Sequence, residues 1–386
     1  MLAAASLGAC EGNVSWNPGN DEWEWAALSG PDALTPELVS NHEPLVVAGP
    51  DLLLGTADGV WRRSLAGDAD WERTGLDGRT IHSLVMTADG GRIVAAGFDP
   101  RDDSAPTVWH STTGGLHWIP AAVWPRAAPS GLDAGTSFRF ASLEPDPHDA
   151  NVVYGGLDAD TIAVTVDGGA TWIMTDGALE PSFGYPCVAH RPRNAAVLLQ
   201  GCELPLDVAW IGSRDVNEDD RFSLTAFRFL FGYPEDAELG NRRINAIAAP
   251  TGRDDRVLVG VEGGLLELTS EAGGWTARAE IDARWVYRSD GDGTRPYAYV
   301  RAIATLSANG RHVLFGGTVN GINEELSLFE TSIGGTTVRR VATPHTFDDP
   351  RVEQAVRLGA GDVLLVISDA GSREPRAPKV YRLRRR

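Results

Sequence analysis

A short apolar segment that ends in glycine recurs along most of this chain and constrains its fold more than any other feature. In order, the segments are Leu52–Gly55, Ile93–Gly97, Val152–Gly156, Val197–Gly201, Val257–Gly260 and Val313–Gly317, followed by Val363–Ser368, which lacks the glycine. Recurrence of one motif at fairly regular intervals is typical of architectures built from repeated units that bury their apolar faces against each other. The 386 residues are therefore predicted to form one repeat domain.

An alternating apolar segment precedes the glycine-ended segment in several repeats. Examples are Ile81–Thr87, Phe138–Pro145, Ile244–Pro250 and Ala298–Leu306. Alternation of apolar and polar residues over such a length predicts a half-buried strand. Each such pair is predicted to form the inner two strands of one unit, and the fold class is predicted to be all-β.

The most specific motif is the turn Thr165–Trp172, which reads TVDGGATW. The Thr165 hydroxyl and the Asp167 carboxylate are expected to hydrogen-bond the backbone of the turn, because short polar side chains stabilise turns in this way. Gly169 is expected to adopt a positive φ, and Trp172 to pack between sheets. Degenerate copies lie at Ser111–Trp118, Ser270–Ala277, Thr331–Val338 and, more weakly, Ser64–Trp71. The motif is predicted to be structural.

This turn matches the Asp-box, S/T-x-D-x-G-x-T-W, and from about residue 13 onward the chain resembles the BNR/Asp-box β-propeller superfamily. The superfamily includes sialidases, a xyloglucanase type of glycosidase, the sortilin ectodomain and a photosystem assembly factor. The resemblance implies a single β-propeller of about seven four-stranded blades over residues 13–386, with the Asp-boxes away from the ligand face. It specifies no activity, since one fold supports unrelated functions.

The last repeat is one strand short, because the chain ends soon after Lys379. The missing strand is predicted at the other end of the chain, where Ser15–Gly19 resembles a box with one inserted residue and Asp21–Leu28 resembles an outer strand. Pairing of this N-terminal strand with the last blade would close the ring and leave no unpaired sheet edge. The fourth repeat has no recognisable box within Trp210–Phe227, so its regularity stays open.

The segment Leu7–Cys10 resembles a bacterial lipobox, the site at which a signal peptide is cut and the new N-terminal cysteine is acylated. Residues 1–12 are accordingly predicted to be a signal remnant with a lipid anchor on Cys10. No basic segment precedes the site and the apolar run is short, so an upstream start or a chance match is the alternative. The expectation is an exported bacterial lipoprotein of the outer membrane or cell surface, facing the periplasm or the exterior, whose only membrane contact is the lipid.

Cys187 and Cys202 flank a segment that reads as strand, turn and strand. Antiparallel pairing would bring the two residues close enough for a disulfide, which an oxidising compartment would preserve. Two buried free thiols are the alternative.

The formal net charge of -19 argues against a nucleic-acid partner, because phosphate would be repelled. The chain is predicted to be a monomer that binds a protein or a glycan. There is no His-Glu-x-x-His motif and no Cys/His cluster, so no metal and no cofactor are expected, although Asp290–Gly293 offers oxygen atoms for calcium.

The loops at the mouth of the ring are the predicted ligand face. Acids recur in the loops between second and third strands: Asp58, Asp99 with Asp102 and Asp103, Asp158 with Asp160, Glu203 with Asp207, Glu262, Glu324 with Glu325, and Asp369. The loops between blades supply the predicted ligand-binding residues Trp124, Arg126, Tyr185, Trp285, Tyr287 and Arg295. The alternatives are that the acids are ordinary turn formers and that the aromatic rings cover the core.

Two functional hypotheses remain. The first is a non-catalytic binding or assembly module, from which an assembly factor differs only in its partner. The second is a secreted glycoside hydrolase, whose acid and base would come from the weak candidates Asp99, Asp158 and Asp160. The Arg-Ile-Pro motif expected of a sialidase is absent.

Overall fold

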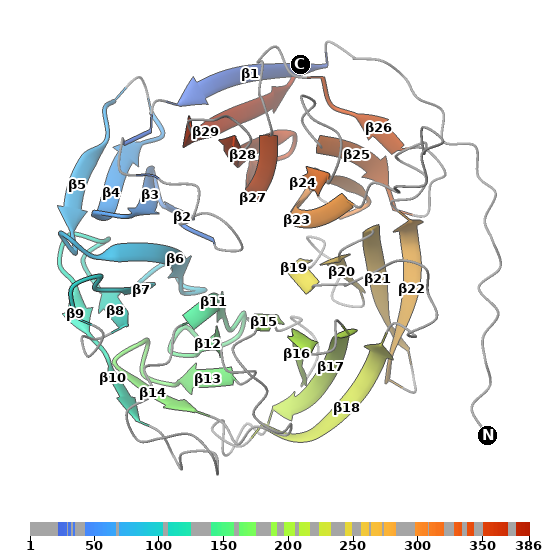
Figure 1. Ribbon diagram of the computed structural model, residues 1–386, viewed down its shortest axis with the longest axis horizontal. Helices are drawn as coiled ribbons and strands as arrows, with labels where there is room; N and C mark the ends of the chain where they lie inside the picture. Colours follow the sequence, from blue (N-terminus) through green and yellow to red (C-terminus); the bar gives the residue numbers. More distant parts are fainter. Residues whose placement is uncertain are drawn as a thin grey trace.

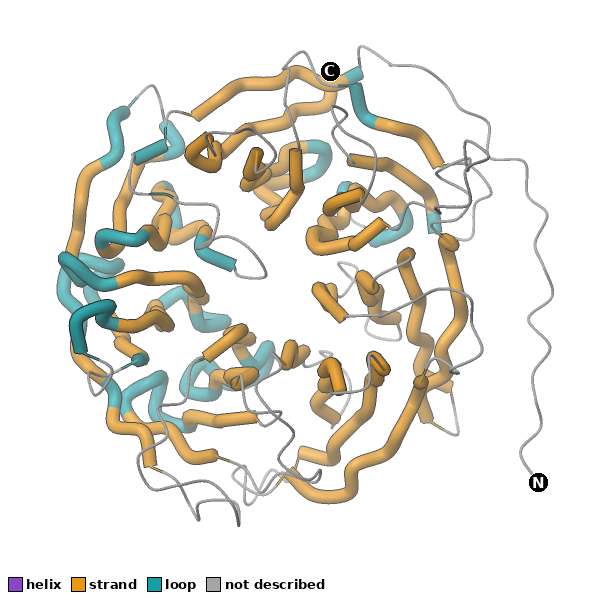
Figure 2. The backbone as a smooth tube through the Cα atoms, viewed as in Figure 1, coloured by secondary structure: helices purple, strands orange, loops and turns teal. Residues whose placement is uncertain are grey.

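The computed structural model describes residues 22–28, 30–31, 34, 43–66, 69–102, 107–124, 140–157, 162–174, 187–190, 197–204, 208–216, 224–232, 244–248, 256–261, 264–271, 274–282, 298–307, 309–319, 328–333, 338–342, 350–369 and 376–386. These residues form strands and connecting loops arranged as a ring around a central axis (Figure 1; Figure 2). The all-β class and the single propeller predicted from the sequence are confirmed. No helix in the described part of the chain is long and apolar enough to span a membrane.

The described strands pair into seven sheets, each of which starts at the axis and ends at the outer rim. The first three contain β2 (Leu45–Ala48), β3 (Asp51–Thr56), β4 (Gly59–Ser64) and β5 (Glu72–Gly75); β6 (Thr80–Met86), β7 (Ile93–Phe98), β8 (Val108–Ser111) and β9 (Ile119–Pro120); and β11 (Phe140–Pro145), β12 (Val153–Leu157), β13 (Ile162–Thr165) and β14 (Thr171–Met174), with β10 (Ala122–Trp124) added at the edge.

The other four contain β15 (Cys187–His190), β16 (Val197–Leu204), β17 (Val208–Val216) and β18 (Leu224–Gly232); β19 (Ile244–Ala248), β20 (Arg256–Val261), β21 (Gly264–Glu271) and β22 (Gly274–Asp282); β23 (Ala298–Thr305), β24 (His312–Val319), β25 (Leu328–Ser332) and β26 (Val338–Arg340); and β27 (Pro350–Gly359), β28 (Asp362–Asp369) and β29 (Arg376–Arg385), with β1 (Trp23–Leu28) added. The fourth repeat, which lacks a box, still forms a four-stranded sheet. The glycine-ended segments all lie in the second strand of their sheet, as predicted.

The recurring glycine is explained by close packing between neighbouring sheets. A Cβ on Gly55 in β3 would overlap the carbonyl oxygen of Ile81 in the next sheet, and a Cβ on Gly260 in β20 would overlap that of Val300. Ile81 and Val300 each begin a β-bulge in their own inner strand. A bulge bends a strand and increases its twist. The sheets therefore approach most closely where one inner strand bulges, and only glycine fits opposite.

The ring closes where the two ends of the chain meet. β1 pairs antiparallel with β29, with Trp23 opposite Arg385 and Leu28 opposite Val380. The predicted closure by the N-terminal strand is thus confirmed. Trp23 is buried, and its indole Nε1 donates a hydrogen bond to Glu330 Oε2 in the neighbouring sheet at 3.1 Å.

Glu330 is the centre of a charged cluster at this closure. Its carboxylate contacts His312 and lies 3.1 Å from Arg385 Nη2, while Arg385 also reaches Glu22 at 3.2 Å. Burial alone raises the pKa of Glu330, but hydrogen bonding and charge from His312, the charge of Arg385 and the indole of Trp23 outweigh it and lower the pKa. The ionised carboxylate of Glu330 in β25 therefore holds both ends of the chain against the adjacent sheet.

One sheet departs from the four-stranded expectation. β10 adds a fifth strand to the β11–β14 sheet and runs parallel to β14, with Val123 opposite Trp172. The residue before β10, Ala121, instead donates its N–H to Val108 O in the preceding sheet at 2.9 Å. One outer segment therefore bonds to two sheets and ties them together at the rim.

Two of the degenerate boxes predicted from the sequence are wrong in register. Ser270 lies opposite Trp275 and Glu271 opposite Gly274, which leaves a two-residue hairpin loop in place of a box. Pairing that continues as far as Glu271 and Gly274 leaves no room for the longer motif. At Ser64–Trp71 the last pair is Arg62 with Glu72, which makes the turn one residue shorter than the box requires. The copy at Thr331–Val338 keeps the box register, with its two end residues paired. Ser15–Gly19 lies outside the described residues.

Candidate functional site

The turn at Thr165–Trp172, which resembles an Asp-box in sequence, has the predicted hydrogen bonds. The Thr165 hydroxyl accepts from Gly169 N at 3.0 Å, and Asp167 Oδ1 accepts from Thr171 N at 2.8 Å. Asp167 Oδ2 also accepts from the Thr171 hydroxyl at 2.6 Å. Gly169 has a φ of 98°, and Trp172 is fully buried. The Thr165 and Thr171 hydroxyls and the Asp167 carboxylate are thus used within the turn, as expected of a structural motif.

The degenerate copy of this turn at Ser111–Trp118, in the β6–β9 sheet, keeps the same geometry without a carboxylate. The Ser111 hydroxyl accepts from Gly115 N at 3.0 Å, and the Thr113 hydroxyl accepts from His117 N at 2.8 Å. Thr113 occupies the place of the aspartate, so a hydroxyl replaces one of its acceptor bonds.

Each of these turns also packs on the sheet before it. A Cβ on Gly169 would lie 3.0 Å from Val94 in β7, and a Cβ on Gly115 would lie 3.0 Å from Leu53 in β3. Arg92 donates to the carbonyl oxygen of Asp167 across the same boundary. The boxes therefore join neighbouring sheets, and no open site lies within them.

Two of the predicted mouth acids that the structure describes, Asp58 and Asp99, are used in local contacts. Asp58 accepts from Gly78 N at 3.0 Å and pairs with Arg73, so it anchors the following loop. Asp99 accepts from Arg101 N at 3.0 Å. This backbone hydrogen bond, followed by the side-chain bond and charge of Arg101, lowers the pKa of Asp99 despite the opposing effect of burial. An ionised carboxylate of this kind is unsuited to act as a general acid at neutral pH.

Several other predicted site residues fall outside the described part of the molecule. These are the acids Asp158 and Asp160, the anchor Cys10, the acidic turn Asp290–Gly293, and the ligand-binding candidates Arg126, Tyr185, Trp285, Tyr287 and Arg295. Trp124 is described only in its backbone, as the last residue of β10. The grouping of these ligand-binding residues therefore stays a prediction.

Cys187 and Cys202 lie directly opposite each other on the antiparallel strands β15 and β16. Opposed residues of such a pair have Cα atoms about 4.5 to 5.5 Å apart, within the range of disulfides. Their side chains lie outside the described residues, so the disulfide stays a prediction.

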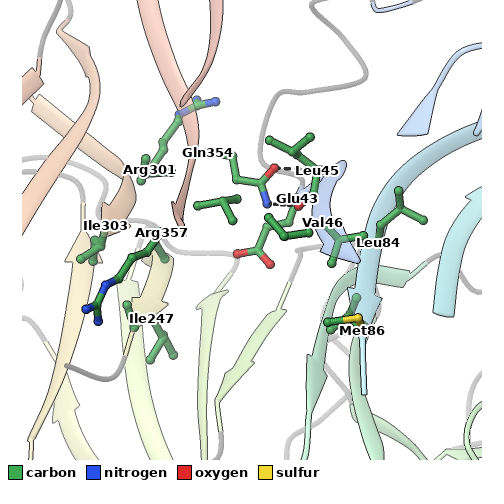
Figure 3. Close-up of a pocket in the computed structure, with 17 residues that line it drawn as sticks. Glu43, Leu45, Val46, Leu84, Met86, Ile247, Arg301, Ile303, Gln354 and Arg357 are labelled. Atoms are coloured by element: carbon green, nitrogen blue, oxygen red, sulfur yellow. Dashed lines mark hydrogen bonds between the residues drawn. The ribbon is translucent and has the colours of Figure 1, made fainter. Parts of the chain in front are cut away.

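A cavity of about 390 Å³ lies at the centre of the ring, and the sequence reasoning did not find it. Its walls come from the inner strands β2, β6, β19, β23 and β27 (Figure 3). The lining is mostly aliphatic, including Leu45, Val47, Leu84, Ile247 and Ile303. Ligand sites commonly combine apolar walls with a few oriented polar groups in a volume of this order.

Four polar residues line this central cavity: Glu43, Arg301, Gln354 and Arg357. Glu43 precedes β2 and is exposed, and Figure 3 shows its carboxylate directed into the cavity. The guanidinium groups of Arg301 and Arg357 point away from that carboxylate in the same view. Glu43 is the only acidic residue among the described lining residues.

Arg301 is neutralised by a buried partner. Its Nη1 donates to Glu353 Oε2 at 2.9 Å, and the second Glu353 oxygen accepts from the Ser368 hydroxyl at 2.7 Å. The Glu353 side chain is 1% exposed and that of Arg301 is 11% exposed. The guanidinium of Arg357 donates through Nε to the carbonyl oxygen of Gly359 at 3.3 Å, toward the far end of β27.

Gln354 holds two inner strands together beside Glu43. Its Oε1 accepts from Leu45 N and its Nε2 donates to Leu45 O, both at 2.9 Å. The carbonyl oxygen of Glu43 accepts from Leu84 N at 2.9 Å. The backbone that carries Glu43 is thus fixed to both neighbouring sheets, which makes the cavity wall rigid. In the sequence, only Arg301 of these polar residues lies in a segment that was predicted to be an inner strand, Ala298–Leu306.

The fold and cavity define a single all-β propeller with a solvent-open centre. No protein-family model matches the sequence, and no curated protein matches it. Several solved structures match the fold. A chain in the crystal structure of the mitotic checkpoint complex has a TM-score of 0.58 at 13% identity, over 100% of this chain and 99% of that chain.

Two further structures match at similar levels. YCF48 bound to D1 peptide has a TM-score of 0.54 at 13% identity, over 96% of this chain and 99% of that chain. The WD40 β-propeller domain of Doa1 has a TM-score of 0.55 at 12% identity, over 93% of this chain and 95% of that chain. At such identities the likeness concerns the fold alone.

Proposed function

We propose that this chain is a non-catalytic propeller that binds a polypeptide at the central cavity. The observation that carries the proposal is a solvent-open cavity whose aliphatic walls are supplied by five inner strands. These strands are fixed by backbone and side-chain hydrogen bonds, so the cavity is largely preformed, which lowers the entropic cost of binding.

The described acids favour binding over catalysis. Glycoside hydrolysis needs two carboxyl groups facing one sugar. Asp58 and Asp99 instead bond the loops beside them, and Glu353 is buried against Arg301. In the cavity itself Glu43 has no second acid beside it among the described lining residues.

The fold relatives support a polypeptide as the partner. YCF48, which has this fold, was solved with a D1 peptide bound, and another relative belongs to a protein complex. An axial cavity of about 390 Å³ suits an extended segment or a loop that inserts a side chain. We extend the proposal to membership of the Asp-box propellers, on the geometry of the Thr165–Trp172 turn.

Selection from a random peptide library displayed on phage tests the proposed function. We expect the immobilised full chain to enrich peptides that bind saturably, and Ala355→Phe to weaken their binding by about tenfold or more, since the added ring occupies the cavity. Ala26→Phe, on the exposed outer strand β1, is the matched control and should bind as the wild type does. Failure to enrich any peptide, or equal binding by both variants, would contradict a peptide site in the cavity.

We also propose that the chain is exported and anchored through a lipid on Cys10, from the lipobox-like segment that ends there. Two-phase separation in detergent after expression in a bacterium tests this proposal. We expect the wild type in the detergent phase and Cys10→Ser in the aqueous phase. Recovery of both proteins in the aqueous phase would exclude the anchor.

A further inference from the structure

Two of the four polar residues in the wall of the central cavity have their partners in the neighbouring strands. Both ends of the Gln354 amide bond the backbone of Leu45, each at 2.9 Å. The guanidinium of Arg301 donates to the buried carboxylate of Glu353, also at 2.9 Å. These groups hold the inner strands in place, and a polar ligand would have to compete with contacts that already exist.

The other two polar residues of the wall also have partners in the protein. Arg357 Nε donates to the carbonyl oxygen of Gly359 at 3.3 Å. The carbonyl oxygen of Glu43 accepts from Leu84 N, and Glu43 takes part in a further interaction within the chain. A charged ligand would therefore lose its hydration on entering the cavity and would have to displace these contacts to replace it, which is unfavourable.

Apolar side chains supply much of the surface that faces the centre of the ring. Val46 and Val47 of β2, Met86 of β6, Ile247 of β19 and Val356 of β27 line the cavity and are only partly buried. Figure 3 shows Val46, Met86 and Ile247 on different strands around it. Partly exposed apolar side chains that gather in one hollow are typical of a binding site.

An aliphatic side chain on a peptide matches the cavity in chemistry and in size. It carries no polar group, so it gains from burial in proportion to its area and needs no hydrogen-bond partner. The volume of about 390 Å³ lies at the small end of the range for ligand sites. A fatty acid also has an apolar chain, but the formal charge of -19 on this protein would repel its carboxylate.

We propose that the central cavity accepts an aliphatic side chain, such as leucine, from a polypeptide partner. This proposal rests on the proposed function and names the side-chain chemistry that the site selects. Binding energy comes from apolar surface buried against the inner strands, while the polar wall residues keep those strands in position.

The test uses the full chain and four synthetic peptides, Ac-Ala-Ala-X-Ala-Ala-NH2, in which X is leucine, asparagine, lysine or glutamate. Asparagine has nearly the shape of leucine but is polar. Isothermal titration calorimetry should show that the leucine peptide binds about tenfold or more tightly than each of the others, as expected for burial of one aliphatic side chain. Its binding should show a negative heat-capacity change and should change by less than about twofold as salt is raised.

Ile247→Thr should weaken binding of the leucine peptide by about threefold or more, because it removes apolar surface from the wall. Threonine is also β-branched and suits a strand, so the fold should be kept. Ile119→Thr makes the same change on the outer strand β9, where Ile119 is 52% exposed, and should bind as the wild type does. If Ile247→Thr does not fold, Val47→Thr tests the wall at β2.

Four results would overturn the proposal while leaving the proposed function standing. The asparagine, lysine or glutamate peptide binds as tightly as the leucine peptide, or none of the four binds although library peptides do. The folded wall variant binds the leucine peptide as the wild type does, or octyl glucoside, a lipid-like probe, binds in the cavity more tightly than the leucine peptide. If library selection yields no peptide either, the proposed function fails together with this proposal.

Discussion

Trp172 shows how a single side chain in a turn motif joins two sheets. It is fully buried, it meets the ring of Phe140 edge to face with centroids 4.9 Å apart, and its Nε1 donates to Gly169 O at 3.2 Å. It also belongs to a core cluster with Val94 and Val108 of the preceding sheet. The sequence predicted this burial, because the tryptophan has a fixed place at the end of the motif.

Replacement of Trp172 by alanine should destabilise the protein by about 3 to 5 kcal/mol, the range for removing a large aromatic side chain from a core. Urea denaturation followed by circular dichroism measures this change. Leu116→Ala is the control, since Leu116 is 49% exposed in the equivalent turn of the β6–β9 sheet, and should change stability by less than about 0.5 kcal/mol. A loss below about 1 kcal/mol for Trp172→Ala would contradict its role as a core residue.

The contribution of the same turn to protein stability depends on pH through the Asp167 carboxylate. Burial alone raises its pKa, but hydrogen bonds from the Thr171 hydroxyl and amide and from Thr165 outweigh burial and lower it. A pKa lowered by folding stabilises the protein above the unfolded-state value, about 3.9 for aspartate, and this contribution is lost as pH falls through the folded-state value.

The melting temperature of Asp167→Asn should therefore lie below that of the wild type at pH 7, and the gap should narrow as the pH falls below about 4. Differential scanning calorimetry across this range measures the gap. Glu24→Asn, which removes an exposed acid on β1, should show no such gap. A constant gap for Asp167→Asn at all pH values would show that its charge is not involved.

Among the elements, the second strand of each sheet was the most predictable. Its apolar run and its terminal glycine are local sequence signals, and both reflect packing that every repeat shares. The third-to-fourth strand turns were less predictable. SEAGGWTA looks like a degraded box, but the pairing of Glu271 with Gly274 replaces it by a short hairpin. Strand register is set by pairing across the sheet, which a short motif does not specify.

The pairing of β15 with β16 makes a disulfide between Cys187 and Cys202 a specific prediction. Intact mass spectrometry after alkylation without a reductant should show two fewer modified thiols than alkylation after reduction. Cys187→Ser should leave Cys202 alkylated without reduction. Full alkylation of both cysteines in protein purified from an oxidising compartment would show that they are free thiols.

At the scale of the whole molecule, the ring depends on contacts between the chain ends. β1 fills the outer edge of the sheet that contains β27, β28 and β29, and Trp23 and Arg385 both contact Glu330 of the next sheet. Without β1, β29 becomes an unpaired edge that can associate with other chains.

Deletion of residues 1–30 should lower the melting temperature and cause the protein to self-associate, as measured by thermal denaturation and light scattering. If the deletion prevents folding, Trp23→Ala in the full chain tests the same contact and should lower stability by about 3 to 5 kcal/mol. A truncated protein that stays monomeric with an unchanged melting temperature would refute closure by β1.

The sequence by itself determined the all-β class, the repeat, the closing strand and the hydrogen bonding of the Thr165–Trp172 turn, because each depends on residues close together in the chain or on a pattern that recurs. The tertiary structure alone decided where the candidate site lies. Gln354 and Leu45, which bond to each other in its wall, are 309 residues apart. Glu43 and Gln354 line one cavity only because the ring brings the first and last inner strands, β2 and β27, together. Short-range patterns carry no information about such contacts, since closure of the ring sets them.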